Sequence, residues 1–429
     1  MLELTIASLS HAGEGIGRHA GQAVFVPFAL PGERVLVEVV EEKKRYLRAR
    51  LVQVLVAAPE RIIPRCPHHF ALPAEPGAPI PEACGGCQLQ HLDYPAQLRF
   101  KQQTVIEQFR RLGGLAEAPV LPTLPSPAPF NYRNHSQFTV TAGGRLGLLA
   151  AGSHRVVPLA ECPQLEPALA ALFPQIAVEA AQAPALERVS LRAGVEDECL
   201  VVLEPAGDAP EVELDLPVSV VLLRADGSSL PLAGLDHVVV EVRGRLFRVS
   251  AGSFFQVNTA LAGTLVDLVL HGLALAGGES VLDLYTGVGL FSAFIAPHAG
   301  RVVGVEAYAP AVADAAANLD EFDNIEIYEA QVEDVLPNLP GPFDAAVLDP
   351  PRAGCAPEVL AALAAAQVAR IVYVSCDAAT LARDAARLVA LGYVLNLVQP
   401  LDMFPQTHHV ECVAEFTVSK AIDLKLENR

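Results

Sequence analysis

The segment Ile371-Val-Tyr-Val-Ser-Cys-Asp377 has the pattern of a short, buried apolar strand that ends in a thiol. Two earlier apolar runs also end in polar turns, Val281-Leu-Asp-Leu-Tyr-Thr-Gly-Val-Gly289 and the run before Asp349-Pro-Pro-Arg352. From about Ser253 such strands alternate with Ala- and Leu-rich helical segments, which predicts a parallel, doubly wound α/β sheet. Sheets of this kind bind ligands outside the carboxyl ends of their strands. The sequence therefore predicts a reactive site at that edge.

The whole chain has the length and composition of a folded multidomain protein. Its 429 residues give a prior of about three domains. Hydrophobic residues make up 52% and charged residues 18%, which favours packed cores over disorder. No uncharged apolar stretch reaches the roughly 18 residues of a membrane span, and the first residues lack the features of a signal peptide. We expect a cytoplasmic monomer with no membrane partner.

The charge distribution bears on possible nucleic-acid binding. The net charge of −19 argues against non-specific attraction to a polyanion. Basic residues nevertheless gather in two segments, Lys43–Arg50 and Arg99–Arg111, the second of which includes Lys101. Each segment is equally compatible with a solvated basic face.

Residues 1–62 are expected to form a small β-barrel. Short β-type runs alternate with turns at about ten-residue spacing, as in small barrels. The segment resembles a TRAM domain, a barrel used by RNA-modifying enzymes, in its Gly13-Glu-Gly-Ile-Gly17 loop, its Phe25-Val-Pro27 strand and its Leu30-Pro-Gly-Glu33 turn. A generic barrel without an RNA role is the alternative.

Residues 63–250 are expected to form a mixed central domain that contains a cysteine cluster. Prolines interrupt β-rich runs there, and residues 94–115 have the apolar spacing of a helix that ends at Gly113-Gly114. Without a secretory signal, cysteines are more often ligands or catalysts than disulfides. Thiolates select zinc or iron–sulfur clusters, and a single Cys-x-x-Cys favours a cluster, although unrelated buried thiols are the alternative. The four cysteines are Cys66, Cys84, Cys87 and Cys162.

The glycine turn after residue 284 indicates the type of cofactor. The third glycine of a dinucleotide fingerprint is absent, and there is no P-loop lysine. The next strand ends in Glu306, where a carboxylate can accept hydrogen bonds from ribose hydroxyls. S-adenosylmethionine is therefore favoured over NAD or ATP, and Asp283 and Asp349 suit its sulfonium cation.

Taken together, the motifs resemble those of the RNA uracil-5-methyltransferase family, in particular its TRAM-containing 23S ribosomal RNA branch. The resemblance covers nearly the whole chain and includes the glycine turn, Asp-Pro-Pro-Arg, Ser-Cys-Asp, Phe254-Phe-Gln-Val-Asn258 and Phe404-Pro-Gln-Thr-His-His-Val-Glu411. It implies a Rossmann-like methyltransferase domain over residues 251–429. It also implies a nucleophile, Cys376; a base, Glu411; contacts to S-adenosylmethionine from Gln256, Tyr285, Glu306 and Asp349; and a 4Fe-4S cluster on Cys66, Cys84, Cys87 and Cys162.

The sequence departs from the family pattern in a few places. The spacer between Cys66 and Cys84 is long, Asp377-Ala378 replaces Asn-Pro, Leu290 replaces a polar residue, and Gln331 stands where an acid is common.

C5 of uracil is a weak nucleophile, so methylation needs a thiolate at C6 and a base for the C5 proton. A base must also leave its stack to reach them.

Other functions were weighed against this one. Cytosine-5-methyltransferases place a cysteine directly after the acid motif, where this chain has Arg352-Ala353. Amino-methyltransferases need no thiol. A non-catalytic RNA-binding scaffold would lack Cys376 or Glu411, and both are present. Ribosomal RNA is favoured over transfer RNA because the transfer-RNA branch typically lacks the barrel and the cluster, although archaeal-type transfer-RNA enzymes keep them.

Overall fold

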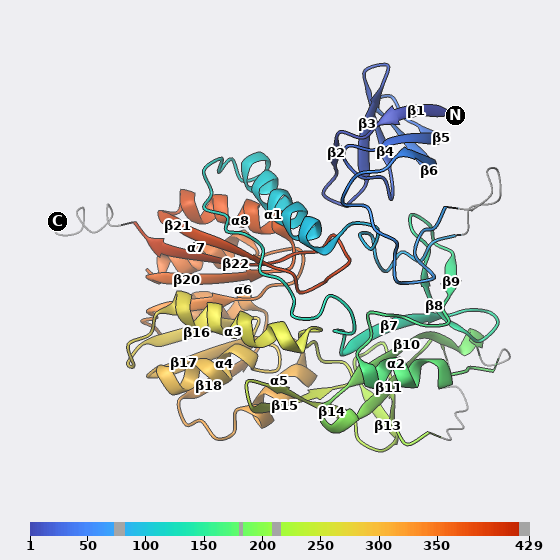
Figure 1. Ribbon diagram of the computed structural model, residues 1–429. Coiled ribbons are helices and arrows are strands. Elements are labelled where there is room, and N and C mark those ends of the chain that lie inside the picture. The colour runs from blue at the N-terminus through green and yellow to red at the C-terminus, as the bar shows by residue number, and fades with distance from the viewer. Residues whose placement is uncertain (73–81, 180–182, 208–215, 420–429) are drawn as a thin grey trace.

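The computed structural model describes residues 1–72, 82–179, 183–207 and 216–419. A small barrel projects from a larger body, in which a mixed sheet lies beside a mainly parallel sheet flanked by helices (Figure 1). None of the helices in these ranges is long and apolar enough to cross a membrane.

The barrel is a six-stranded sheet in the order β1-β5-β6-β4-β3-β2. Alternate residues of its strands point inward, so that Val35 and Val37 of β5 are fully buried. Glu33 is also fully buried, and its carboxylate accepts hydrogen bonds from Leu30 N at 2.8 Å and Arg61 Nη2 at 2.8 Å. This ion pair ties the barrel to the chain that follows it. The strands are β1 Leu2–Thr5, β2 Ser8–Leu9, β3 Gly15–His19, β4 Gln22–Val26, β5 Arg34–Glu42 and β6 Tyr46–Val56.

Helix α1 (Tyr94–Arg111) lies against helix α8 (Ala378–Ala390). The Asp93 side chain caps its first turn by accepting a hydrogen bond from Ala96 N at 2.7 Å. The helix ends at Arg111, before the predicted glycine pair, because Leu112 N and Gly113 N already share the carbonyl of Gln108. The interpretation of residues 99–111 as a basic segment is wrong for Lys101, which is completely buried.

The central region contains a seven-stranded sheet in the order β13-β12-β11-β10-β7-β8-β9 and a separate hairpin, β14-β15. Phe138, Leu165 and Val189 lie in the core on one face of that sheet. The elements are β7 His135–Val140, β8 Leu146–Leu149, β9 Val156–Pro158, α2 Pro167–Leu172, β10 Leu186–Ala193, β11 Cys199–Pro205, β12 Ser219–Leu223, β13 Ser229–Ala233, β14 His237–Val242 and β15 Arg245–Ser250.

The C-terminal sheet has the order β18-β17-β16-β19-β20-β22-β21, and its first five strands are parallel. Strand β22 runs antiparallel to its neighbours β20 and β21, so that β21 has the same direction as the first five strands, and two apolar cores cover the two faces. The predicted doubly wound fold is therefore confirmed. The elements are α3 Thr259–Leu273, β16 Ser280–Leu284, α4 Leu290–Ile295, β17 Arg301–Glu306, α5 Ala309–Asn318, β18 Ile325–Glu329, α6 Val332–Val335, β19 Ala345–Leu348, α7 Pro357–Ala365, β20 Arg370–Ser375, α8 Ala378–Ala390, β21 Tyr393–Leu401 and β22 Glu411–Val418.

Packing is continuous between the central and C-terminal regions. Val240 and Phe247 of the hairpin share one core with Leu265 of α3 and Val281 of β16. The boundaries 1–62, 63–250 and 251–429 therefore stay predictions.

Candidate active site

Three of the four predicted cofactor residues meet at the carboxyl edge of neighbouring strands. Glu306 ends β17, Tyr285 follows β16, and Asp349 follows β19. Glu306 Oε2 accepts a hydrogen bond from Gly287 N at 3.0 Å, while Oε1 accepts from the backbone of residues 307 and 308 at 2.8 Å. Asp349 N donates to Leu284 O at 3.2 Å. The edge is thus held together before any ligand binds.

Asp283 lies buried beneath the glycine turn and organises it. Its Oδ2 accepts hydrogen bonds from Thr286 Oγ1 at 2.7 Å and from Ser292 N and Oγ at 2.9 and 2.6 Å. Gly289 has φ +88°, and a Cβ there would lie 2.7 Å from Leu319 Cδ1, so only glycine fits. Burial raises the pKa of Asp283, despite the hydrogen bonds that favour its charged form.

Tyr285 has φ +64°, a conformation that a tyrosine adopts only under constraint. Its hydroxyl forms a hydrogen bond with the Cys355 side chain. Burial raises the pKa of Tyr285, and the Cys355 thiol adds to the shift. Cys355 N in turn donates to Tyr373 Oη at 3.2 Å and to Asp384 Oδ2 at 2.9 Å. This buried network fixes the glycine turn relative to the loop that follows Asp349.

Cys376 and Glu411 come together although they lie on different strands. β20 and β22 are antiparallel, and their register pairs Ser375 with Cys412. One residue further toward the carboxyl edge of β20, Cys376 therefore lies opposite Glu411. Glu411 is 2% exposed, and Cys376 is half-buried.

The electrostatics of this pair depend on burial and on two neighbours. Burial raises the pKa of Cys376 to about 11, helped by the negative charges of Glu411 and Asp349 and opposed by Arg352, which also hydrogen-bonds the thiol. Burial raises the pKa of Glu411 well above its usual value, with a further contribution from Asp349. The pKa of Asp349 rises to about 7, mainly through burial and then through Asp283. A carboxyl with a raised pKa is suited to accept a proton near neutral pH.

Two histidines precede Glu411 and are neutral near pH 7. The rings of His408 and His409 lie 4.2 Å apart between centroids. Burial lowers the pKa of His408 to about 4 and of His409 to about 3, and the positive charge of Arg352 adds to both shifts. Both rings are therefore uncharged at neutral pH, so they add no positive charge to that of Arg352.

The fourth predicted cofactor residue, Gln256, is buried on the segment before α3. Its carbonyl accepts a hydrogen bond from Asn134 Nδ2 at 3.0 Å. Within the described ranges, no hydrogen bond joins its side chain to the other three residues. Its contact with a cofactor stays a prediction.

The four predicted cluster cysteines line a single cavity of about 250 Å³. A Cβ at Gly85, between Cys84 and Cys87, would lie 2.8 Å from Leu149 O, so the turn needs glycine. Burial raises the pKa of Cys84 to about 11 and of Cys87 to about 12, with contributions from the other thiols. In residues 1–72, 82–179, 183–207 and 216–419, no three His, Cys, Asp or Glu side chains lie close enough to hold one metal ion.

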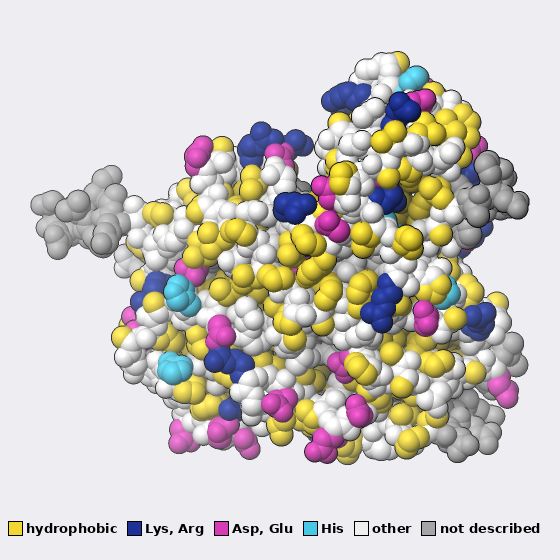
Figure 2. All heavy atoms as spheres, in the orientation of Figure 1, with side chains coloured by type: hydrophobic (Ala, Val, Ile, Leu, Met, Phe, Trp, Pro, Cys, Tyr) yellow, Lys and Arg dark blue, Asp and Glu magenta, His cyan; other side chains and the backbone are white. Residues whose placement is uncertain are grey.

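The sequence did not predict a large groove between the barrel and α1. It has a volume of about 1220 Å³ and extends from the barrel to Asp377, the residue after Cys376. Figure 2 shows Lys and Arg side chains on both sides of the recess between these elements. Arg48 is paired with Glu14 and Arg111 with Glu107, whereas Arg99 has no salt bridge within the part of the chain that the structure describes. The aromatic residues of its lining are Phe25, Tyr46 and Phe100.

Comparison with known proteins identifies the family. Residues 1–52 match the model of the TRAM domain, and residues 221–339 and 342–417 match that of the tRNA (Uracil-5-)-methyltransferase family. A relative from Gloeobacter violaceus, named an uncharacterized RNA methyltransferase, is 38% identical over 95% of this chain and 94% of its own length. The chain belongs to the RNA uracil-5-methyltransferase family.

Other members of this family are similar over the same extent. A Streptomyces avermitilis protein, also named an uncharacterized RNA methyltransferase, is 38% identical over 96% of this chain and 97% of its own length. Among solved structures, Pyrococcus abyssi tRNA (uracil-54, C5)-methyltransferase in complex with S-adenosyl-L-homocysteine superposes with a TM-score of 0.72. It is 27% identical in sequence, and the match covers 97% of this chain and 100% of that chain. The N-terminal TRAM domain, the methyltransferase fold and the predicted enzyme class are thereby confirmed.

Proposed function

We propose that this RNA uracil-5-methyltransferase transfers a methyl group from S-adenosylmethionine to C5 of a uridine in 23S ribosomal RNA, through a covalent adduct between Cys376 and C6. The observation that carries the proposal is the meeting of Cys376 and Glu411 at the sheet edge beside Asp349. A thiol and a carboxyl with a raised pKa are the two groups that the reaction needs.

The proposed reaction consists of addition, methyl transfer and elimination. The Cys376 thiolate adds to C6 and pushes electrons onto the uracil ring, so that C5 attacks the sulfonium methyl group and releases S-adenosylhomocysteine. Glu411 removes the C5 proton, the C5–C6 double bond re-forms, and the C6–S bond breaks to return the thiolate. Arg352 favours the thiolate through its charge and its hydrogen bond to the sulfur.

Glu306, Tyr285 and Asp349 are proposed to hold S-adenosylmethionine at the edge of the sheet, with Gln256 as a fourth contact. The carboxylate of Glu306 suits ribose hydroxyls, and the buried Asp283 adds negative charge near a sulfonium. The Pyrococcus abyssi relative was solved with S-adenosyl-L-homocysteine, the product of this donor, which supports the assignment.

The groove between the barrel and α1 is proposed to bind RNA. Arg99 can contact a phosphate, and Phe25, Tyr46 and Phe100 provide faces on which unpaired bases can stack. Because the groove reaches Asp377, a bound strand could deliver an extruded base to Cys376.

A 4Fe-4S cluster on Cys66, Cys84, Cys87 and Cys162 remains part of the proposal. Their side chains line one cavity, and thiolates are the usual ligands of such clusters. The cluster would hold together segments far apart in the chain and take no part in methyl transfer.

Covalent trapping tests the chemistry. RNA that contains 5-fluorouridine has no C5 proton to lose, so with S-adenosylmethionine the wild-type enzyme should form an adduct that survives a denaturing gel. Cys376→Ala should form none and should lose methylation to background. The matched control Cys199→Ala, a half-buried cysteine outside the site, should behave as wild type. An adduct with Cys376→Ala would refute the nucleophile.

The target RNA has a second candidate, transfer RNA, favoured by the function of the Pyrococcus abyssi relative. Mass mapping of 5-methyluridine in 23S ribosomal RNA and transfer RNA from a deletion strain distinguishes the two. Loss from 23S ribosomal RNA is expected, and loss confined to transfer RNA would overturn that target.

A further inference from the structure

The loop Asp402–Val410 leads from β21 to Glu411 and has an unusual backbone at one residue. Gln406 has φ +70°, in the left-handed region that a residue with a side chain rarely adopts. Such a conformation persists where surrounding contacts impose it, and it is common at active sites. The loop therefore needs an external element to hold it in this shape.

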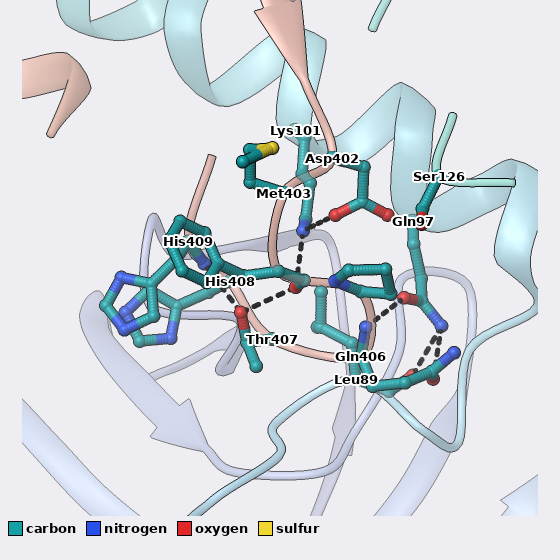
Figure 3. Close-up of polar contacts among 12 residues, drawn as sticks. Leu89, Gln97, Lys101, Ser126, Asp402, Met403, Gln406, Thr407, His408 and His409 are labelled. Carbon is teal, nitrogen blue, oxygen red and sulfur yellow. Dashed lines mark hydrogen bonds and ion pairs between the residues drawn. The ribbon is translucent and has the colours of Figure 1, made fainter. Parts of the chain in front are cut away.

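That element is α1, through the buried side chain of Gln97 (Figure 3). Gln406 N donates to Gln97 Oε1 at 3.1 Å, and Gln97 Nε2 donates to Gln406 Oε1 at 2.9 Å. The same Nε2 also donates to Leu92 O at 2.8 Å. The Gln97 side chain therefore bonds both the backbone and the side chain of Gln406. Its bond to the Leu92 carbonyl fixes the orientation of the Gln97 amide.

Two further contacts hold the loop in the same place. Lys101, one helical turn after Gln97, forms a buried ion pair with Asp402, and its Nζ donates to Phe404 O at 3.0 Å. Gln406 O accepts hydrogen bonds from Gln88 N at 3.0 Å and Leu89 N at 2.9 Å. The loop before Glu411 is thus fixed by segments some three hundred residues earlier in the chain.

We propose that Gln97 is a positioning residue for the base: by holding Gln406, it sets the place of the Glu411 carboxyl relative to Cys376. The inference rests on the proposed function, in which Glu411 removes the C5 proton. Cys376 follows β20, and its hydrogen-bond partner is Arg352, which lies outside this loop. Loss of Gln97 should therefore slow elimination and leave thiolate addition unchanged.

The experiment separates the two steps in the full-length enzyme. Gln97→Leu should form the 5-fluorouridine adduct at the wild-type rate with an unchanged KM for RNA. On uridine RNA its kcat should fall about ten- to hundred-fold, the scale of a misplacement of about 1 Å, and a methylated adduct should accumulate. Gln102→Leu, a half-buried glutamine on the same helix, is the matched control and should turn over normally.

Gln406→Leu tests the same pair from the loop, in case Gln97→Leu does not fold. The double variant should be no slower than either single variant, because the two residues act through one contact. Normal kcat in the folded single variants, or equal losses of adduct formation and kcat, would overturn the proposal. Glu411→Gln is assayed in parallel: if it fails to accumulate adduct, the proposed function fails, whereas accumulation there with normal turnover of Gln97→Leu refutes only the role of Gln97.

Discussion

The molecule gathers cysteines in two places, and their surroundings differ. At the sheet edge, one thiol, Cys376, faces Arg352 and the carboxyls of Glu411 and Asp349. In the central cavity, the neighbours of each thiol include other thiols, and Cys66 and Cys162 both raise the pKa of Cys84.

The direction of the pKa shift does not distinguish the two places. Burial raises the pKa of Cys376 to about 11 and that of Cys84 also to about 11. The difference lies in what can stabilise a thiolate: Arg352 favours the charged form of Cys376, whereas the thiols of the central cavity would need the metal cluster proposed above. The neighbours of the thiols, rather than the direction of their pKa shifts, therefore distinguish the two places.

The largest effect is expected at Glu411. Replacing it with glutamine should reduce turnover about 10²- to 10⁴-fold, the usual contribution of a general base. Addition and methyl transfer should continue, so a methylated protein–RNA adduct should accumulate on ordinary uridine RNA, visible by denaturing gel and mass spectrometry. Near-normal turnover would mean that the carboxyl is not the base.

Substitution of a cysteine in the central cavity should change the stability and iron content of the protein rather than the rate of the reaction at Cys376. Cys87→Ala should remove iron and acid-labile sulfide and lower Tm by about 5 °C or more, since ligand loss removes binding free energy that stabilises the fold. The rate of adduct formation at Cys376 should change less than tenfold in the variant that remains folded. Cys199→Ala is the control. Stoichiometric zinc with no iron in the wild-type protein would contradict the cluster.

The reaction proposed for Cys376 should show a pH dependence that follows the environment of the thiol. Because the pKa of Cys376 is raised to about 11, the thiolate fraction grows as pH rises through the neutral range. Adduct formation with 5-fluorouridine RNA should therefore accelerate up to about tenfold per pH unit between roughly pH 7 and 9. Arg352→Gln should lower the rate throughout that range, because the arginine favours the thiolate. A flat profile would show that the thiol is already ionised.

The smallest effect is expected in the groove. Arg99→Gln should weaken RNA binding modestly and reduce the slope of log affinity against log salt by about one, because one phosphate contact is lost. Arg110→Gln, on the same helix but outside the groove, should leave the slope unchanged. Equal slopes for both variants would remove Arg99 from the proposed RNA path.

Much of the fold could be predicted from local sequence patterns. The alternation in Arg34–Glu42 predicts a half-buried strand, and apolar runs that end in polar turns predict parallel strands with a site at their carboxyl edge. Tyr285, Glu306 and Asp349 follow neighbouring strands, so their common edge was predictable once the sheet was recognised. The role of each side chain remains to be tested.

The strands, the turns and the residues with reactive chemistry could be predicted from the sequence, because they depend on periodicity and on short motifs. Which distant groups lie in contact depends on how the elements pack. Lys101 belongs to a basic run in the sequence, yet it is buried against Asp402. Gln97 carries no motif signal, yet it bonds the strained Gln406. Both pairings arise from the packing of α1 against the C-terminal region, and such long-range contacts leave no pattern in the local sequence.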